Sequence, residues 1–399
     1  MKNRLIFGLA LLGALALTSC ASDDTADINI TDNSVTNNNT TGGGNTGGET
    51  IFLSGTYTED LTLDANNSYV VNGSLIMASG TTLTIPPCMT IEALAAGSDV
   101  YIAISQGATI DAQGTADCPI VFTSNASAPA AGDWGGLIIL GDAPINSVSG
   151  TATATSEIAS LPYGGTDTTD NSGTLRYVRV QYSGGSADGQ SENNGISFYG
   201  VGNGTTVEYV QVFEGKDDGF EFFGGTVNAD YISVVNAQDD SIDWTEGYTG
   251  TITNAYVQHG ADHDKGIEAD GFNTDIGNNS NPIFFSAPTV NNLTIVGLGS
   301  GTSSEAIRLR AGTRAIFNNV VLEGYGEGFD LDGNSTDSPT GAGVVDGDTQ
   351  VTDILFTDIT LKVKNDTGVM FTEADLIAGD GNGTGTDYAT WGAGWTVGN

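Results

Sequence analysis

Basic residues are scarce in this chain of 399 residues, which has 11 lysines and arginines against 49 aspartates and glutamates. The formal net charge of −38 argues against nucleic acid as a partner, because binding to phosphate backbones requires clustered lysine and arginine. Such an acidic surface attracts cations. It equally fits adaptation to a salty medium without any specific ion site, so both explanations stay open.

Proline is also rare, with 9 residues, and no stretch has the apolar periodicity of a long amphipathic helix. The 57 glycines are typical of a turn-rich, all-β chain. The 2 histidines are His259 and His263, and the sequence has no Gly-x-Ser-x-Gly elbow, nucleotide-binding loop or His-Glu-x-x-His zinc motif. Carboxylates are therefore the main candidates for chemistry.

One apolar run lies near the N-terminus, and it is too short to span a membrane comfortably. It extends from Leu5 to Leu17, follows Lys2 and Arg4, and is closed by Ser19 and Cys20. This arrangement resembles the lipobox of bacterial lipoproteins. The resemblance implies a signal peptide over residues 1–19, a lipid on Cys20 and attachment to the membrane through that lipid alone.

Residues 20–50 are predicted to be a tether. They are rich in Asn, Thr and Gly and cannot bury much apolar surface, so we expect a flexible, solvated segment. Asp23 and Asp24, close behind Cys20, resemble the surface-export signal of Bacteroidota lipoproteins. The resemblance implies an outer-membrane protein that faces the cell exterior.

The remaining cysteines, Cys88 and Cys118, are 30 residues apart, which is about one coil of the repeat described below. In an oxidising compartment they are predicted to form a disulfide. Two buried free thiols are the alternative.

A pattern of charged, small, apolar, charged and apolar residues recurs along the second half of the chain. Its copies begin at Asp218, Asp240, Lys265, Glu305 and Glu327, and a similar strand begins at Asn194. The central apolar residues follow one another at spacings of 24, 22, 25, 40 and 22 residues. Strands beginning at Tyr209, Tyr231 and Tyr256 repeat the offsets of 22 and 25. This period predicts a parallel β-helix forming a single domain over residues 51–399, with the C-terminal residues capping its end.

Strand alternation places the apolar residues of each copy inside and the charged residue between them outside. Glu221, Asp243 and Glu268 are therefore predicted to form a solvent-facing ladder that continues into Arg308 and Asp330, with rungs ~4.8 Å apart. Arg308 is expected to neutralise Glu268 and Asp330, while nothing basic is expected beside Glu221 and Asp243.

The turns before these strands add further carboxylates and lead to a calcium hypothesis. Oxygen ligands at this density suit Ca²⁺, which accepts irregular geometry. The alternative is that these aspartates only stabilise turns through backbone hydrogen bonds. The candidate ligands are Asp217, Asp218, Glu221, Asp239, Asp240 and Asp243.

The coils resemble the pectin-lyase-like, right-handed parallel β-helix superfamily. Segments 132–141, 217–247, 265–270 and 391–396 further resemble a group of surface lipoproteins frequent in Bacteroidota. The likeness covers about residues 50–399. Its motifs are specific for the group but do not indicate an activity.

Three functional hypotheses follow. The leading one is a non-catalytic envelope protein that binds Ca²⁺ and carbohydrate, with Tyr199, Phe223 and Tyr248 as exposed stacking platforms. The second is a polysaccharide lyase or glycoside hydrolase. For a hydrolase, the trial catalytic residues are the acid pair Glu221 and Asp243. For a lyase, Ca²⁺ would bind a uronate of the substrate, and Lys265 or Arg310 would be the base that removes its proton. The third is an adhesin or scaffold for other envelope proteins.

Overall fold

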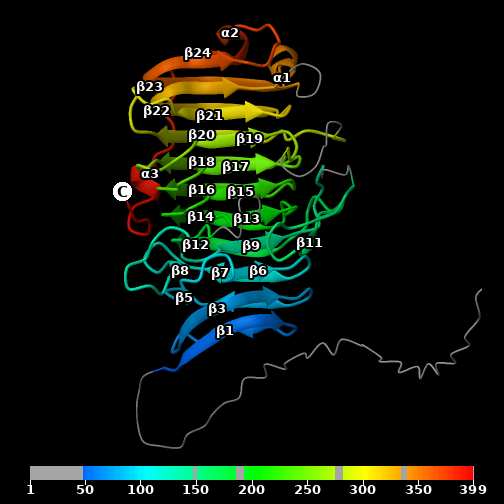
Figure 1. Cartoon of the computed structure of the whole chain (residues 1–399), viewed down its shortest axis with the longest axis vertical. Coiled ribbons are helices and arrows are strands. Elements are labelled where there is room, and N and C mark those ends of the chain that lie inside the picture. The colour runs from blue at the N-terminus through cyan, green and yellow to red at the C-terminus, as the bar shows by residue number, and fades with distance from the viewer. Residues whose placement is uncertain (1–47, 147–150, 186–192, 275–281, 334–338, 399) are drawn as a thin grey trace, which may run out of the picture. The chain divides into compact units, whose positions relative to one another are not determined.

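The strands pair in parallel with strands of the neighbouring coils and stack into a β-helix (Figure 1). The computed structural model describes residues 48–146, 151–185, 193–274, 282–333 and 339–398. In these residues 22 strands form one continuous hydrogen-bonded sheet, and a separate antiparallel pair is made by β10 (Ala154–Thr155) and β11 (Pro162–Tyr163). The predicted all-β, parallel β-helix fold is confirmed.

One column of the β-helix consists of short strands, each paired with the equivalent strand of the next coil. These strands are β6 (Tyr101–Ile104), β9 (Leu137–Leu140), β13 (Ile196–Tyr199), β15 (Phe220–Phe223), β17 (Ile242–Thr245), β19 (Ile267–Asp270) and β21 (Glu305–Arg310). The charged pattern found in the sequence lies on this column.

Longer strands form the rest of each coil. They are β1 (Thr50–Tyr57), β3 (Ser68–Met77), β12 (Gly173–Gln181), β14 (Thr206–Phe213), β16 (Asn228–Val235), β18 (Thr251–Gln258), β20 (Thr289–Val296), β22 (Ala315–Leu331) and β23 (Thr349–Asn365). In the first coils two short strands replace one long strand. The short strands are β2 (Leu61–Thr62), β4 (Thr82–Ile85), β5 (Thr90–Ala93), β7 (Thr109–Gln113) and β8 (Ile120–Ser124). α1 (Thr340–Asp346) lies between β22 and β23, and α2 (Glu373–Leu376) and β24 (Ile377–Asp380) follow β23.

The long strands bend at a residue with left-handed backbone, where a side chain other than glycine is strained. Tyr209 and Tyr231 both have φ of 55°, and Asn254 has φ of 57° at the same position one coil later. The tyrosine rings stack at centroid distances of 4.4 Å for Tyr177 with Tyr209 and 4.3 Å for Tyr209 with Tyr231. Ring stacking between coils therefore helps to hold this bend.

The strand register predicted from the charged pattern is confirmed. Phe220 pairs with Ile242, and Ile267 pairs with Ile307 across the insertion over residues 271–288. For the second set of strands the predicted register is wrong at one step, because Tyr256 pairs with Ser233 rather than with Tyr231. The two extra residues of this coil lie in the turn between β18 and β19. A shift of two residues keeps every side chain on its predicted face.

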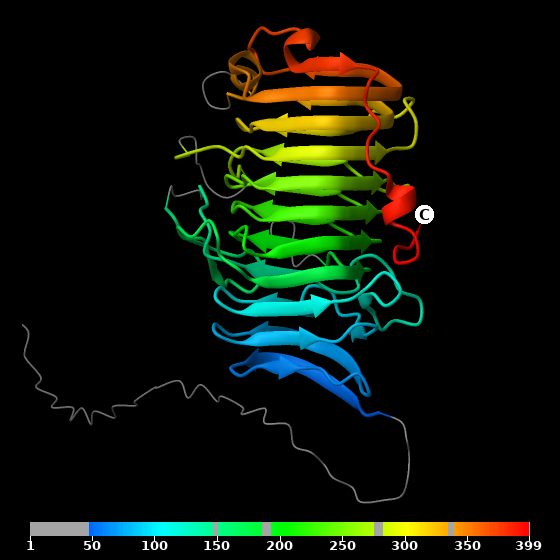
Figure 2. The same ribbon diagram turned by 180° about the vertical axis from the view of Figure 1, so that it is seen from behind.

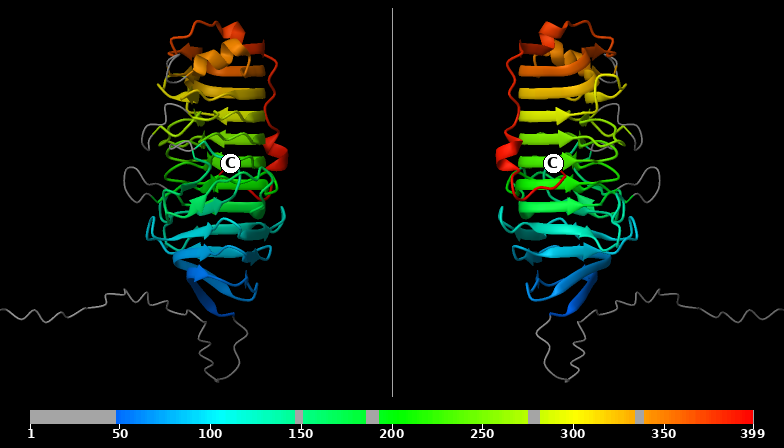
Figure 3. Two further views of the ribbon diagram at one scale, coloured as in Figure 1. Left: turned by 90° about the vertical axis from the view of Figure 1, so that its right-hand side faces the viewer. Right: turned by 90° about the vertical axis from the view of Figure 1, so that its left-hand side faces the viewer.

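The C-terminal segment does not stay at the end of the β-helix as predicted. After β24 the chain turns back along the long strands, and α3 (Tyr388–Trp391) lies beside β16 and β18 (Figures 1 and 2). The side views show the same descent (Figure 3). Nε2 of Gln211 donates to the carbonyl of Val397 over 3.0 Å, and Nη1 of Arg179 donates to that of Trp395 over 2.8 Å. These polar side chains on the long strands hold the C-terminal segment along its path.

Cys88 and Cys118 form a disulfide, and their Cα atoms are 4.4 Å apart. The predicted signal peptide, the predicted lipidation site Cys20 and nearly all of the predicted tether lie outside the described residues. Within the described ranges, no helix has the length and apolar character needed to cross a membrane.

Candidate functional site: an acidic ladder on the short strands

The structure stacks the predicted ladder in the predicted order. Glu221 pairs with Asp243, and Asp243 pairs with Glu268. Glu268 then pairs with Arg308, and Arg308 with Asp330. The carboxylates of three successive coils are thus vertical neighbours, as the alternation of apolar and charged residues requires.

The prediction that the ladder faces open solvent is wrong. Glu268 is only 7% exposed and Asp330 only 1%, while Glu221 and Asp243 are partly buried. Glu268 is surrounded by Lys265 and Arg310, which form ion pairs with it, and beside Glu221 a side segment packs on the outward face of the short strands. Ile145, between β9 and β10, joins the outward side chains of Tyr199 and Phe223 in a second apolar cluster.

The three aromatic residues predicted as exposed sugar platforms are buried, so that assignment is corrected. Tyr199 and Phe223 are each 2% exposed, and their rings stack on one another at 4.0 Å. Tyr163 covers Tyr199 at a centroid distance of 4.9 Å. Tyr248 lies in the main core, where it stacks on Phe222 at 4.5 Å and donates to a backbone carbonyl. A sugar ring cannot reach these faces.

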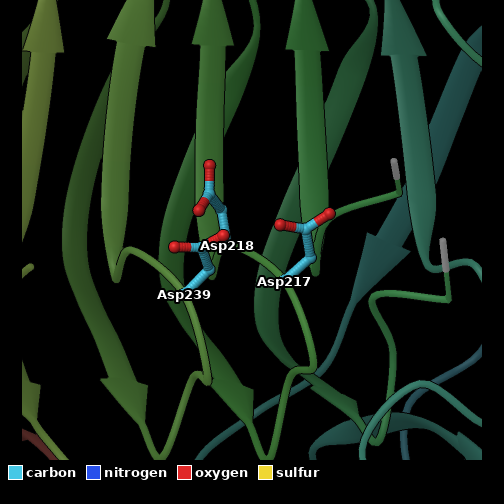
Figure 4. A group of neighbouring side chains, drawn as sticks. All are labelled: Asp217, Asp218 and Asp239. Atoms are coloured by element: carbon cyan, nitrogen blue, oxygen red, sulfur yellow. The ribbon is translucent and has the colours of Figure 1, made fainter. Parts of the chain in front are cut away.

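The candidate calcium ligands converge in overlapping groups. In each group, one oxygen per residue lies within 4.8 Å of the others. Figure 4 shows one such group, with carboxylates from neighbouring coils directed into shared space. The groups include Asp217, Asp218 and Asp239; Asp218, Glu221 and Asp243; Asp239, Asp240 and Asp264; and Asp240, Asp243 and Glu268.

Burial and mutual repulsion disfavour ionisation of these carboxylates. Burial, and then neighbouring carboxylates, raise the pKa of Asp218, Glu221 and Asp243 well above the usual range. Arg310 opposes the rise in the pKa of Asp243, but among the described residues no lysine or arginine makes an ion pair with any of these three. A divalent cation would supply the missing positive charge.

Hydrogen bonds support the alternative role of the aspartates in part. Oδ1 of Asp218 accepts from the backbone N–H of Asp240 at 3.0 Å, and Oδ1 of Asp240 accepts from that of Lys265 at 2.7 Å. These bonds link one coil to the next. Nδ2 of Asn194 donates to Oε2 of Glu221 at 2.6 Å. Each bond uses a single oxygen, so the aspartates both stabilise the turns and keep a second oxygen for other partners.

Lys265 and Arg310 do not fit the role of catalytic base. Lys265 is 6% exposed, and its Nζ lies 3.0 Å from Glu268 and 3.9 Å from Asp240. Burial alone would lower the pKa of Lys265, but Asp240 and Glu268 raise it above the usual value. Arg310 forms ion pairs with Glu268 and, at 2.6 Å, with Asp270, so both cations stay protonated.

Arg308 forms its shortest contacts with Asp332, which lies outside the predicted ladder. Its Nε donates to Asp332 at 2.8 Å, whereas its Nη1 is 3.8 Å from Glu268. Asp330 is instead neutralised by Lys364, whose Nζ lies 3.0 Å away. The expectation that Arg308 neutralises both of its rungs holds only for Glu268.

A further acidic group, Glu305, Glu327 and Asp330, lies nearer the C-terminal end. Burial and then Asp330 raise the pKa of Glu305 to about 7. The sequence carried a signal for this group, since Glu305 and Glu327 open two copies of the charged pattern. Unlike Asp218, Glu221 and Asp243, this group has a cation, because Lys364 forms ion pairs with Glu327 and Asp330.

His259 lies in the interior, 3% exposed, between the hydroxyls of Ser241 and Tyr325 at 3.2 and 2.9 Å. Burial, and then His263, lower the pKa of His259 to about 3, so the ring is neutral at pH 7. It is a packed histidine with no access for a substrate.

Comparison with protein families shows which family the chain belongs to. Residues 55–396 match the family described as the pectate-lyase like beta helix domain. The chain belongs to this family. The matched range covers nearly every coil of the described β-helix, including the strands that carry the acidic ladder. Neither the curated proteins nor the solved structures give a significant match.

Proposed function

We propose that the protein is a non-catalytic, cation-binding β-helix of the cell envelope and that its acidic ladder binds Ca²⁺. One observation carries the proposal: Asp218, Glu221 and Asp243 bring oxygens within 4.8 Å of one another, and the described chain provides no ion pair for them. Burying an unpaired carboxylate is costly, so such groups either stay protonated or take up a cation.

Calcium suits the donor set better than a transition metal does. The cluster offers carboxylates without histidine or cysteine, and hard oxygen donors are typical of Ca²⁺ and Mg²⁺ sites. Ca²⁺ accepts about six to eight oxygens in flexible geometry, whereas Mg²⁺ requires a near-ideal octahedron. The side chains of Asp218, Glu221 and Asp243, with Asp217 and Asp239 at one edge, would hold the ion.

The envelope location rests on the sequence. The lipobox-like residues before Cys20 and the acidic residues behind it support a lipid-anchored protein on the outer surface of the outer membrane. The strongly negative surface suits a medium rich in divalent cations, which would screen its self-repulsion.

Family membership favours one alternative, a polysaccharide lyase or glycoside hydrolase. A pair of catalytic carboxyls needs environments that push the two pKa values apart. Here the pKa values of Glu221 and Asp243 are both raised, and burial is the largest cause for both. The lyase route lacks a free base, because Lys265 and Arg310 both form ion pairs with Glu268, and this supports the non-catalytic proposal.

Calorimetric titration with CaCl₂ tests the proposal. We expect saturable binding to the purified protein at neutral pH and at least a roughly tenfold weaker affinity for Glu221→Gln, which loses a charged ligand of the same shape. Asp117→Asn removes an exposed carboxylate away from the ladder and serves as the matched control. Equal calcium affinity in all three proteins would contradict the proposal. Release of products from uronate-rich or neutral glycans by the wild type, abolished in Glu221→Gln, would favour the enzyme instead.

A further inference from the structure

The returning C-terminal segment borders an open hollow beside β18. Its volume is about 550 Å³, within the range of roughly 300–1,000 Å³ typical of small-ligand pockets. Tyr256 and Gln258 line it from β18, and Thr386, Asp387 and Tyr388 line it from the C-terminal segment. Since β18 is one of the long strands, the hollow lies on a different strand column from the acidic ladder.

Aromatic rings form the apolar part of the hollow. Tyr256 and Tyr388 stack at a centroid distance of 3.9 Å with 11° between their planes, and Trp391 meets Tyr388 edge-on at 4.8 Å. Tyr256 is partly exposed although Tyr388 is buried. Rigid aromatic surface with hydroxyls at its edge suits a ligand that has both an apolar face and polar groups.

The polar groups of the hollow include both donors and acceptors. The hydroxyl of Tyr256 donates to Oε1 of Gln258 at 2.9 Å, which fixes the carboxamide and leaves its Nε2 as a donor. The hydroxyl of Thr386 accepts from Nε1 of Trp391 at 2.8 Å and can still donate. The carboxylate of Asp387, an exposed residue, is an acceptor, and no hydrogen bond to it occurs within the described chain.

Charge restricts the class of ligand. The residues lining the hollow include Asp387 but no lysine or arginine. Phosphates, sulfates and uronates lack a cationic partner here and would meet the repulsion of a protein whose net charge is −38. A neutral ligand with many hydroxyls and an apolar face fits these constraints.

We infer that this hollow binds one sugar residue of a neutral glycan, with its apolar face against Tyr256 and its hydroxyls on Gln258 and Asp387. The inference goes beyond the proposed function, because it adds a carbohydrate site away from the acidic ladder, and it does not depend on the calcium site. The hollow is preformed: the backbone N–H of Thr386 donates to Thr294 at 3.0 Å, and the hydroxyl of Ser233 donates to that of Tyr388 at 3.1 Å. A preformed site loses little conformational freedom on binding.

Titrations with cellohexaose, mannohexaose, galactohexaose and hexagalacturonate test this inference. We expect at least one neutral hexamer to bind and hexagalacturonate not to bind. Gln258→Glu replaces a donor with an acceptor of the same shape, and Asp387→Asn removes the charged acceptor. Each should weaken binding by about tenfold or more, because each leaves a sugar hydroxyl without its partner. Unchanged melting temperatures of both variants would show that the fold is intact.

Glu221→Gln distinguishes failure of this site from failure of the calcium proposal. It should leave the affinity for the neutral hexamer unchanged, both in CaCl₂ and in chelator. The inference is overturned if none of the neutral hexamers binds, if binding is indifferent to both substitutions, or if hexagalacturonate binds as tightly. Calcium binding that persists in any of these cases would leave the proposed function intact.

Discussion

Replacing Asp218 and Asp243 together with asparagine should stabilise the protein in chelator and remove its response to calcium. The two carboxylates lie in one group with Glu221, with oxygens within 4.8 Å of one another. Two unit charges about 4 Å apart repel by roughly 1 kcal/mol in water and roughly 4 kcal/mol at an effective dielectric of 20. Asparagine keeps the oxygen of residue 218 that accepts from the backbone of Asp240. The substitution therefore removes charge while preserving that link between coils.

The pH dependence has a definite sign. The pKa values of Asp218 and Asp243 are raised in the folded protein, mainly by burial. Their contribution to stability is fully present below the unfolded pKa of about 4 and is lost as pH rises through the folded pKa values. In chelator the wild type should therefore lose more stability between pH 4 and neutral pH than the double variant.

Calcium should reverse the order of the two proteins. A ligand that binds the folded state at about 100 times its Kd stabilises that state by roughly 2.7 kcal/mol. The wild type should gain this stabilisation in CaCl₂, and the double variant should not. Thermal unfolding in chelator and in CaCl₂ measures both effects, with Asp117→Asn as the control that behaves like wild type. If the wild type melts at the same temperature in both media, the ladder has no calcium function.

Trp395→Ala should cause the largest loss of stability of any substitution in the C-terminal segment. The side chain is fully buried and packs edge-on against Tyr177 and Tyr209 at 5.6 and 6.2 Å. Its Nε1 donates to the carbonyl of Trp391 at 2.7 Å. Replacing a buried tryptophan with alanine costs about 3–5 kcal/mol through lost burial and the cavity left behind.

Urea unfolding of Trp395→Ala measures this cost, and Met370→Ala is the control because Met370 is 91% exposed. The control should lie within about 0.5 kcal/mol of wild type, as expected for a surface substitution. Deletion of residues 381–399 should destabilise at least as much as Trp395→Ala, since it uncovers the stacked tyrosines. A loss below about 1 kcal/mol for Trp395→Ala would mean that the segment is not packed as described.

The stacking of the ladder was predictable because it depends on local sequence. In each copy of the pattern a charged residue lies between two core residues, so the register of the apolar residues also sets the register of the charges. The register of Phe220, Ile242 and Ile267 therefore placed Glu221, Asp243 and Glu268 correctly. The shifted register of Tyr256 did not matter for the faces, since the shift is an even number of residues.

Burial of the ladder was not predictable by the same reasoning. Ile145 and Tyr163 belong to a side segment without repeat periodicity, and they cover Tyr199 and Phe223 from a different part of the chain. The path of the C-terminal segment escaped prediction for the same reason. Trp395 meets Tyr177 across more than two hundred residues, and nothing in the local sequence around either residue specifies that contact.

Anomalous scattering from crystals grown in CaCl₂ tests the central claim most directly. We predict a peak at about 2.3–2.6 Å from carboxylate oxygens of Asp218, Glu221 and Asp243, the usual Ca²⁺–oxygen distance. The same crystals with these carboxylates bonded only to water and backbone amides, and no peak between them, would contradict the account.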